Sequence, residues 1–283
     1  MELQGKTVAV TGAGSGIGRA LAREFASQGA KVSICGRRRE PLDETVSLIT
    51  AGVGHEPTGP AHAMARVADV TDPVAVKSWI ESTNSAFGPI DVLYHNATAF
   101  RAIGATWELD PELWWNDVAS NMLGAMICAR AVLPQMIERG EGIFINMFGG
   151  GAAKPMPGGS AYGSSKAGQT RLTDTLAAEL EAEGHTGVYV FAMSPGFVRT
   201  EATERHLETP AGDKWLGHKK RFEEGIDRPP EDCAEATVRL IRHACAEFNG
   251  RVFGPDDDFE ALYKERARLR DKDLKQLRMR PFK

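Results

Sequence analysis

A tyrosine and a lysine four residues apart, Tyr162 and Lys166, are the residues of this chain best suited to proton transfer. At this spacing both side chains lie on one face of a helix. A free phenol titrates near pH ~10, and a neighbouring cation favours its ionised form. The pair therefore predicts a tyrosine that exchanges a proton near neutral pH, as general acid–base catalysis requires. Taken alone, the pattern Tyr-x-x-x-Lys also fits a solvated helix face.

A glycine-rich segment near the N-terminus could hold a nucleotide. It follows the apolar run 7–10 and reads Thr11-Gly12-Ala13-Gly14-Ser15-Gly16-Ile17-Gly18. Such a strand-to-helix turn lets the backbone approach a pyrophosphate, whose charge the helix N-terminus stabilises. The spacing is Thr-Gly-x-x-x-Gly-x-Gly; the common Gly-x-Gly-x-x-Gly fails because Ile17 or Arg19 falls where the third glycine is needed. A tight turn without a ligand is the alternative, and the context favours the nucleotide.

The elements that must position these residues alternate between short apolar runs and longer amphipathic stretches. We expect strands at 7–10, 31–35, a third ending near 70, 90–94, 143–147, 188–193 and 250–253. We expect helices at 17–28, 40–49, 73–87, 111–139, 161–183 and from 229–230 onward, with a Gly/Pro-rich loop at 52–60. This alternation predicts an α/β fold with a doubly wound, mostly parallel seven-stranded sheet and helices on both faces.

The chain shows no internal repeat and no linker, so we expect a single domain over 1–255. Within it, the charged segment 200–228 has no strand signal and carries Trp215 and Phe222, which predicts a cover over the ligand site. The charge-dense tail 256–283 fits a solvated terminal helix, and a subunit contact is the alternative.

Bulk properties exclude several classes of function. The sequence is 42% hydrophobic and 25% charged, and its formal net charge of -4 gives no reason to expect a nucleic-acid or membrane-surface partner. The four cysteines are widely spread without a Cys-x-x-Cys pair, which favours reduced thiols and no metal site. The N-terminus lacks signal-peptide features and no apolar run would span a bilayer, so a cytoplasmic protein is expected.

Six landmarks together resemble the short-chain dehydrogenase/reductase family. In order they are Thr11 to Gly18, Asp69-Val70, Asn96-Ala97, Asn121, Tyr162 with Lys166, and Pro195-Gly196-Phe197-Val198-Arg199-Thr200. The resemblance covers roughly residues 5 to 200, and the last strand extends it to about 255. It implies a Rossmann-like domain, a nicotinamide dinucleotide, and hydride transfer between a carbonyl and an alcohol. It also implies a homodimer or homotetramer built on the long helices that carry Asn121 and Tyr162.

The same resemblance assigns roles to individual residues. Asp69 and Val70 would border the adenine, Asn96 and Ala97 the adenosine ribose region, and Val198 and Thr200 the carboxamide. The full expected cofactor set is Gly12, Gly14, Ser15, Gly16, Ile17, Gly18, Arg37, Arg38, Asp69, Val70, Asn96, Ala97, Tyr162, Lys166, Pro195, Gly196, Val198 and Thr200. Tyr162 would be the acid/base, Lys166 would lower its pKa and bind the nicotinamide ribose, and Asn121 would hold a water linking the lysine to solvent.

The choice between the two nicotinamide dinucleotides follows from the end of the second strand. An acid there would accept a hydrogen bond from the ribose 2'-hydroxyl and repel a 2'-phosphate. The chain instead has Arg37, Arg38 and Arg39, and guanidinium groups pair well with phosphate oxygens. NADP(H) is therefore expected, with Arg37 as the first candidate contact and Arg38 as the second.

One catalytic member of the family pattern is missing. The family has a serine thirteen residues before its tyrosine, and Gly149 stands at that position. Losing one such hydrogen-bond donor typically costs about 10²–10³ in rate, or roughly 2.7–4 kcal/mol. A substitute donor could be Ser160, Thr98 or a backbone N–H of the glycine run. Alternatively the substrate fills the space, or the fold binds NADP(H) without normal turnover or uses the tyrosine for another proton transfer.

The expected substrate is a small carbonyl compound or the corresponding alcohol. Phe100, Met147, Phe148, Phe197 and the segment with Trp215 would face it by family position, and Gly149 and Ser160 are further candidates. An apolar, cyclic or aromatic ketone would suit the aromatic residues. Arg101, Arg199 and Lys214 leave an acidic substrate open. We therefore expect an NADP(H)-dependent ketone reductase or alcohol dehydrogenase with an atypical site. A non-redox enzyme of the same fold, such as a cyclase or dehydratase, and a catalytically silent NADP(H)-binding protein are the alternatives.

Overall fold

The strands form from the short runs rich in Val and Ile, and their carboxyl ends all point to one edge of the sheet. The computed structural model describes residues 1–52 and 62–278. Within them the strands are β1 (Thr7–Thr11), β2 (Lys31–Gly36), β3 (Ala63–Val67), β4 (Val92–His95), β5 (Gly142–Met147), β6 (Val188–Met193) and β7 (Val252–Phe253). They pair in the order β3-β2-β1-β4-β5-β6-β7, and every pair is parallel. The predicted doubly wound, seven-stranded sheet is confirmed.

The strand order reverses between β1 and β4, where Val8 pairs with Val92 and Val10 with Tyr94. Open α/β sheets bind ligands in the crevice outside the carboxyl ends of the strands at such a point. The glycine turn after β1 and the loop after β4 both leave the sheet here. The fold therefore brings the two segments to one place.

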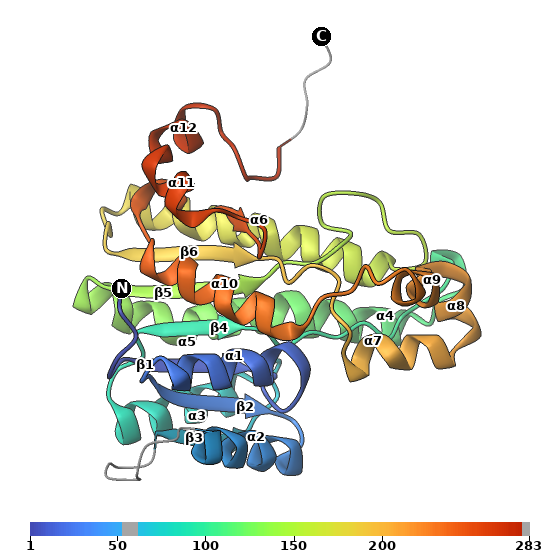
Figure 1. Ribbon diagram of the computed structural model, residues 1–283, viewed down its shortest axis with the longest axis horizontal. Helices are drawn as coiled ribbons and strands as arrows, with labels where there is room; N and C mark the ends of the chain where they lie inside the picture. Colours follow the sequence, from blue (N-terminus) through green and yellow to red (C-terminus); the bar gives the residue numbers. More distant parts are fainter. Residues whose placement is uncertain (53–61, 279–283) are drawn as a thin grey trace.

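Helices cover both faces of the sheet (Figure 1). The main ones are α1 (Gly16–Ser27), α2 (Arg39–Gly52), α3 (Pro73–Phe87), α4 (Pro111–Val118), α5 (Gly124–Arg139), α6 (Ser160–Ala182) and α10 (Pro230–Arg242). One core cluster packs α1, α2 and α10 against the sheet through residues such as Leu21, Leu42 and Leu240. The other packs α3, α5 and α6 through residues such as Trp79, Val132 and Leu180. Two separate apolar layers thus hold the sheet between them.

Helix starts follow the local chemistry of the sequence. Asp72 accepts hydrogen bonds from the backbone N–H groups of Val74 and Ala75, and Pro73 occupies the first turn of α3. Asp110 and Pro111 start α4 in the same way, with Asp110 capping Leu113 N–H. Gly29, with φ of 78°, takes the left-handed conformation that follows the end of α1.

Two predicted boundaries are wrong. The helix expected over 111–139 is interrupted by a π-helical turn, Ala119–Leu123, between α4 and α5. This turn buries Asn121, whose side chain bonds to the loop after β4, and π-turns are frequent at functional sites. The third strand ends at Val67 and not near Val70, because Asp69 accepts hydrogen bonds from the N–H and hydroxyl of Thr71 and turns the chain. Apart from Gly52, which ends α2, the loop expected at 52–60 lies outside the described residues.

The segment 200–228 forms short helices beyond the carboxyl ends of the strands, at the right of Figure 1. They are α7 (Glu201–Arg205), a 3-10 turn (His206–Glu208), α8 (Pro210–Leu216) and α9 (His218–Glu223). Thr200 caps α7, since its hydroxyl accepts from Thr203 N–H while the Thr203 hydroxyl accepts from Thr200 N–H. The segment, which we call the cover (200–228), returns to the body where Val198 bridges Arg228.

The C-terminal tail packs on the domain. It forms α11 (Phe259–Lys264) and α12 (Arg266–Asp271), so the single terminal helix that was expected is divided in two. Phe259 and Leu269 are buried in the same core cluster as α1 and α10. Through residue 271 the tail is thus anchored by two apolar side chains and is not wholly solvated.

The four cysteines are free; Cys35, Cys128 and Cys233 are buried and Cys245 is half-buried. Among the described residues, no helix combines the length and the apolar character needed to cross a membrane.

Candidate active site

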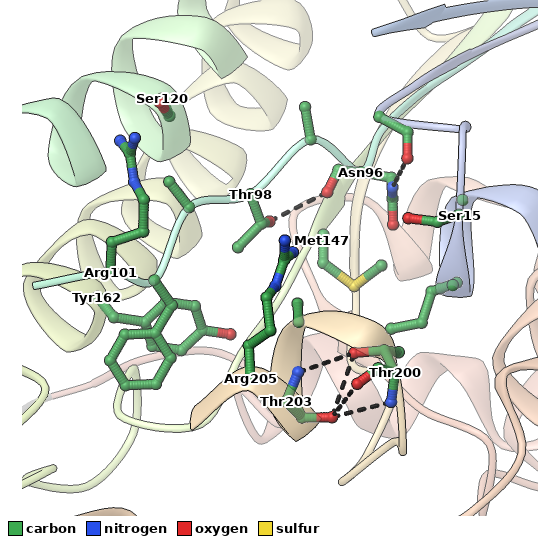
Figure 2. A pocket seen from close by; sticks show the side chains of 18 of the residues that line it. Ser15, Asn96, Thr98, Arg101, Ser120, Met147, Tyr162, Thr200, Thr203 and Arg205 are labelled. Atoms are coloured by element: carbon green, nitrogen blue, oxygen red, sulfur yellow. Dashed lines mark hydrogen bonds between the residues drawn. The ribbon is translucent and has the colours of Figure 1, made fainter. Parts of the chain in front are cut away.

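A cavity of about 760 Å³ lies at the crevice between β1 and β4 and is bordered on one side by the cover. Figure 2 shows side chains from the glycine turn, the loop after β4, α6 and α7 turned toward it. Of the expected cofactor and catalytic residues, those lining it are Gly12, Ser15, Gly16, Ile17, Gly18, Arg37, Asp69, Val70, Asn96, Ala97, Tyr162, Pro195 and Thr200. Residues from six separate segments of the chain therefore meet at one site.

The glycine turn is held against the loop after β4 by close backbone packing. Asn96 donates its side-chain amide to the carbonyls of Thr11 and Gly12, both at 3.1 Å. The hydroxyl of Thr11 accepts from the N–H groups of Asn96 and Ala97. A Cβ added at Gly18 would lie 2.5 Å from the Asn96 amide nitrogen, so only glycine fits there. This cradle suits the phosphates of a dinucleotide.

Five expected cofactor residues lie away from the lining, and Lys166, described below, is one of them. Gly14 faces α2, where an added Cβ would approach Pro41 at 3.0 Å. A Cβ added at Gly196 would lie 2.8 Å from Arg228 Nε. Val198 is buried and forms a β-bridge with the same arginine. Arg38 pairs with Glu201 of α7 at 3.8 Å. Their cofactor roles remain predictions.

Of the three consecutive arginines, Arg37 is the one that lines the cavity. Arg39 pairs with Asp43 within α2 at 2.9 Å. The carboxylate of Asp69 accepts from Thr71, and Val70 lies beside it at the same end of the cavity. The position after β2 therefore presents the guanidinium of Arg37 to the cavity. A carboxylate at the same position would repel a 2'-phosphate.

Tyr162 occupies the space that the glycine at 149 leaves open. A Cβ added at Gly149 would overlap the Tyr162 hydroxyl oxygen and would lie 2.9 Å from the carbon bearing it and 3.1 Å from Lys166 Cγ. On its other side the Tyr162 ring stacks on Phe100, with ring centroids 4.4 Å apart and an interplanar angle of 18°. Phe100 is itself held by His206, whose ring nitrogen Nε2 is 2.9 Å from the Phe100 carbonyl oxygen. The Tyr162 side chain thus lies between Gly149 and the ring of Phe100.

The expected depression of the Tyr162 pKa by Lys166 is wrong for this structure. Burial raises the pKa of Tyr162 to about 12, and the Lys166 ammonium lies 5.7 Å from the ring centroid. Burial also lowers the pKa of Lys166 to about 7. Desolvation disfavours the charged form of each group, and it is the cause of both shifts. At neutral pH Tyr162 is a proton donor.

Asn121 and Lys166 lie just beneath the cavity. The Asn121 side chain accepts from Ala99 N–H at 2.7 Å and donates to the Ala99 carbonyl and the Ser165 hydroxyl. The Lys166 ammonium donates to Thr98 Oγ1, to the Met147 carbonyl and to Gln169 Oε1 at 2.8–3.0 Å. Asn121 therefore fixes the loop that carries Thr98, and Thr98 contacts the lysine.

Of the expected substrate residues in the described part of the chain, Phe100 and Met147 line the cavity, whereas Phe148, Gly149, Ser160, Phe197 and Trp215 do not. Ser160 accepts from Trp114 Nε1 at 3.0 Å. Phe197 stacks with Phe222 inside the cover, and Phe148 is half-buried beside Gly149. Their contact with substrate remains a prediction.

Among the lining residues that were not found from the sequence are Arg205 and His206. Figure 2 shows Arg205 reaching from α7 toward the middle of the cavity. The spacing Thr200-x-x-Thr203 resembles a capping box, and it was the signal that could have placed a helix here. Of the cations named from the sequence, Arg199 pairs with Asp227, whereas Arg101 lines the cavity and donates its Nε–H to Asp117.

Known proteins are similar to this chain in sequence and in fold. The sequence profile of the short chain dehydrogenase family matches residues 6–211. A short chain dehydrogenase of Pseudocercospora fijiensis is 38% identical over 273 residues, which is 93% of this chain and 84% of the relative.

Two solved structures share the fold. A crystal structure of an actinorhodin polyketide ketoreductase variant with NADPH has a TM-score of 0.76 and 29% identity, covering 88% of this chain and 95% of that one. A 3-ketoacyl-(acyl-carrier-protein) reductase from Brucella melitensis complexed with NADH has a TM-score of 0.74 and 26% identity, covering 89% and 97%.

The glycine turn, the seven-stranded parallel sheet, the extent of the profile match and the identity to the fungal relative lead to one conclusion: the chain belongs to the short chain dehydrogenase family of oxidoreductases.

Proposed function

We propose that the protein is an NADP(H)-dependent ketoreductase that reduces a ketone to a secondary alcohol. The observation that carries the proposal is that the proton donor Tyr162 and the glycine turn Gly12 to Gly18 line the same cavity. A nicotinamide supplies the hydride when it is bound. The two solved relatives, one with NADPH and one with NADH, support a nicotinamide cofactor for this chain.

The residues fit such a cofactor. The glycine turn offers backbone at the N-terminus of α1 for a pyrophosphate. Arg37 lies where a 2'-phosphate would be recognised, and charge-assisted contacts between guanidinium and phosphate are strong. Pro195 and Thr200 also border the cavity, and Thr200 lies beside Gly16 of the glycine turn. These contacts favour NADP(H) over NAD(H).

The protonation state of Tyr162 fits the reduction of a ketone. Because burial raises its pKa to about 12, Tyr162 is protonated at neutral pH and can give a proton to a carbonyl oxygen that becomes an alcohol. Its position beside Gly149 and Phe100 fixes where that oxygen must lie. A protonated Tyr162 is therefore suited to the reduction of a carbonyl.

The substrate part of the cavity combines apolar and cationic groups. Phe100 and Ile103 supply apolar surface, while Arg101 and Arg205 bring positive charge. A ketone with an apolar body would fit, and an additional acidic group on it would be favoured by the arginines. We further propose that the protein acts as a homodimer or homotetramer.

A binding titration followed by a ketone panel tests the proposal. NADPH should bind more tightly than NADH, and at least one ketone should drive NADPH oxidation, followed at the nicotinamide absorbance. Equal affinity for both dinucleotides would overturn the role of Arg37. Tight NADPH binding without oxidation by any ketone would instead support the silent binding protein or the non-redox enzyme.

A further inference from the structure

Lys166 is fully buried, and its ammonium donates hydrogen bonds in three directions. The acceptors are Thr98 Oγ1 at 3.0 Å, the Met147 carbonyl at 2.8 Å and Gln169 Oε1 at 3.0 Å. An ammonium carries three N–H donors, so all three are used. Any proton that Lys166 exchanges with solvent must pass along one of these contacts.

Two of the three directions end inside the protein. The Met147 carbonyl accepts but carries no proton of its own. Gln169 continues to His95 Nδ1 at 3.0 Å and to Asn146 Oδ1 at 3.3 Å, and these three residues are buried. His95 Nε2 has no hydrogen-bond partner in the part of the chain that the structure describes. Among the described residues, the hydrogen bonds that start at Gln169 therefore end at buried side chains and do not lead to the cavity.

The third hydrogen bond of Lys166, to Thr98, leads to the cavity. Thr98 is exposed and lines the cavity, and its hydroxyl accepts from Lys166 while donating to the Asn96 carbonyl at 3.0 Å. Figure 2 shows this hydroxyl on the loop after β4, in the middle of the cavity wall. Thr98 is therefore the acceptor of Lys166 that also reaches solvent.

The other candidates do not touch Lys166. The Ser160 hydroxyl accepts from Trp114, and the Asn121 amide is committed to Ala99 and Ser165. Asn121 thus holds Thr98 in place through the loop and offers no side-chain contact of its own to the ammonium.

We propose that the hydroxyl of Thr98 relays protons between Lys166 and water in the cavity. The role rests on the proposed ketoreductase function. Each reduction takes one proton from the pair Tyr162 and Lys166, and the pair must regain it. In the relay, the Thr98 hydrogen turns from Asn96 to a neutral Lys166 amine and forms an N–H bond, while Thr98 oxygen takes a proton from water. One proton moves inward, hydroxide is left in solvent, and no electron is transferred.

The surroundings of Lys166 suit such exchange. Burial lowers the pKa of Lys166 to about 7, so both the amine and the ammonium are populated near neutral pH. The titratable groups facing it are Tyr162 from α6 and His95 from β4. Burial, and next the charge of Lys166, lower the pKa of His95 to about 3, so the imidazole stays neutral.

A matched pair of variants tests the relay in the full-length enzyme. Thr98→Val removes the hydroxyl at nearly constant shape, and Thr98→Ser keeps it. We expect kcat to fall about tenfold or more in Thr98→Val, with a larger solvent isotope effect and a shifted pH profile, and to recover in Thr98→Ser. Both variants should bind NADPH as the wild type does. A loss in kcat/KM at every pH with an unchanged profile and isotope effect would instead make Thr98 a donor to substrate and would overturn the relay.

A second readout needs neither substrate nor turnover. By NMR of lysine-labelled protein, Lys166 ammonium protons should exchange with water about tenfold more slowly in Thr98→Val than in wild type, and Thr98→Ser should restore the rate. The pKa of Lys166 should also fall by about one unit in Thr98→Val, because a hydrogen bond to the charged form is lost. Unchanged exchange would refute the relay whether or not a ketone is found, whereas slowed exchange without ketone reduction would refute only the proposed function.

Discussion

Replacing Gly149 by serine restores the hydroxyl of the family pattern, and the structure predicts that it harms the enzyme. The new Cβ would overlap the Tyr162 hydroxyl and lie 2.9 Å from the carbon that bears it. The ring of Phe100, whose centroid lies 4.4 Å from that of Tyr162, prevents the Tyr162 ring from moving away on its other side. The proton donor must therefore be displaced, or the stack must be broken.

The cost can be estimated from these contacts. A misplacement of roughly 1 Å at a reacting centre can lower turnover by about 10²-fold. Overpacking a filled site costs about 1–3 kcal/mol of stability. A gained hydrogen-bond donor would work in the opposite direction, by about 10²–10³ in rate. We expect the displacement of Tyr162 to outweigh the gained serine hydroxyl, because that hydroxyl can raise turnover only when Tyr162 stays in place.

The assay compares Gly149→Ser with a control at the neighbouring position. A Cβ added at Gly150 meets nothing within 4 Å, so Gly150→Ser should retain wild-type turnover and stability. Gly149→Ala separates the effect of the Cβ from that of the hydroxyl. Turnover is followed by NADPH oxidation with the best ketone, and stability by urea unfolding. A gain in turnover of tenfold or more in Gly149→Ser alone would refute the reasoning and show that a donor is missing.

Two further predictions concern the cofactor and the cover. Arg37→Ala should weaken NADPH binding by about tenfold or more and leave NADH unchanged, whereas Arg39→Ala, whose arginine pairs with Asp43, should change neither; equal weakening of both dinucleotides would count against a phosphate contact. Burial, and next the charge of His206, lower the pKa of His218 to about 4, whereas a histidine of the unfolded chain titrates near ~6.5. Between these two pH values the unfolded state binds more protons than the folded state. The stability of the fold therefore falls as the pH drops from ~6.5 to ~4. His218→Phe should reduce this dependence in urea unfolding at pH 7 and pH 5, and an unaltered pH dependence would contradict it.

The sequence predicted the sheet and the location of the site because both depend on local patterns. Apolar runs that alternate with helical stretches require a parallel sheet, and parallel strands place the glycine turn and Asn96 at one edge. Counting back from Tyr162 identified Gly149 without any coordinates. The sheet follows from spacing and order along the chain, whereas the significance of Gly149 also depends on the resemblance to the family.

The remainder depends on burial and on contacts between distant segments. The rise in the Tyr162 pKa follows from desolvation, which the spacing of tyrosine and lysine does not reveal. Thr98 and Lys166 are 68 residues apart, and the sequence offered Thr98 only as one of several substitutes. The π-turn at Ala119–Leu123 forms where the buried Asn121 side chain bonds to the loop after β4, a contact that helix periodicity does not encode.

The central claim is that Tyr162 delivers the proton in an NADPH-dependent ketone reduction. The most direct measurement is ketone-driven NADPH oxidation by wild type and by Tyr162→Phe, with the affinity for NADPH measured in parallel. We expect Tyr162→Phe to bind NADPH as the wild type does and to lose about 10²–10⁴-fold in kcat. Equal turnover by the two proteins, with NADPH bound to both, would contradict the account.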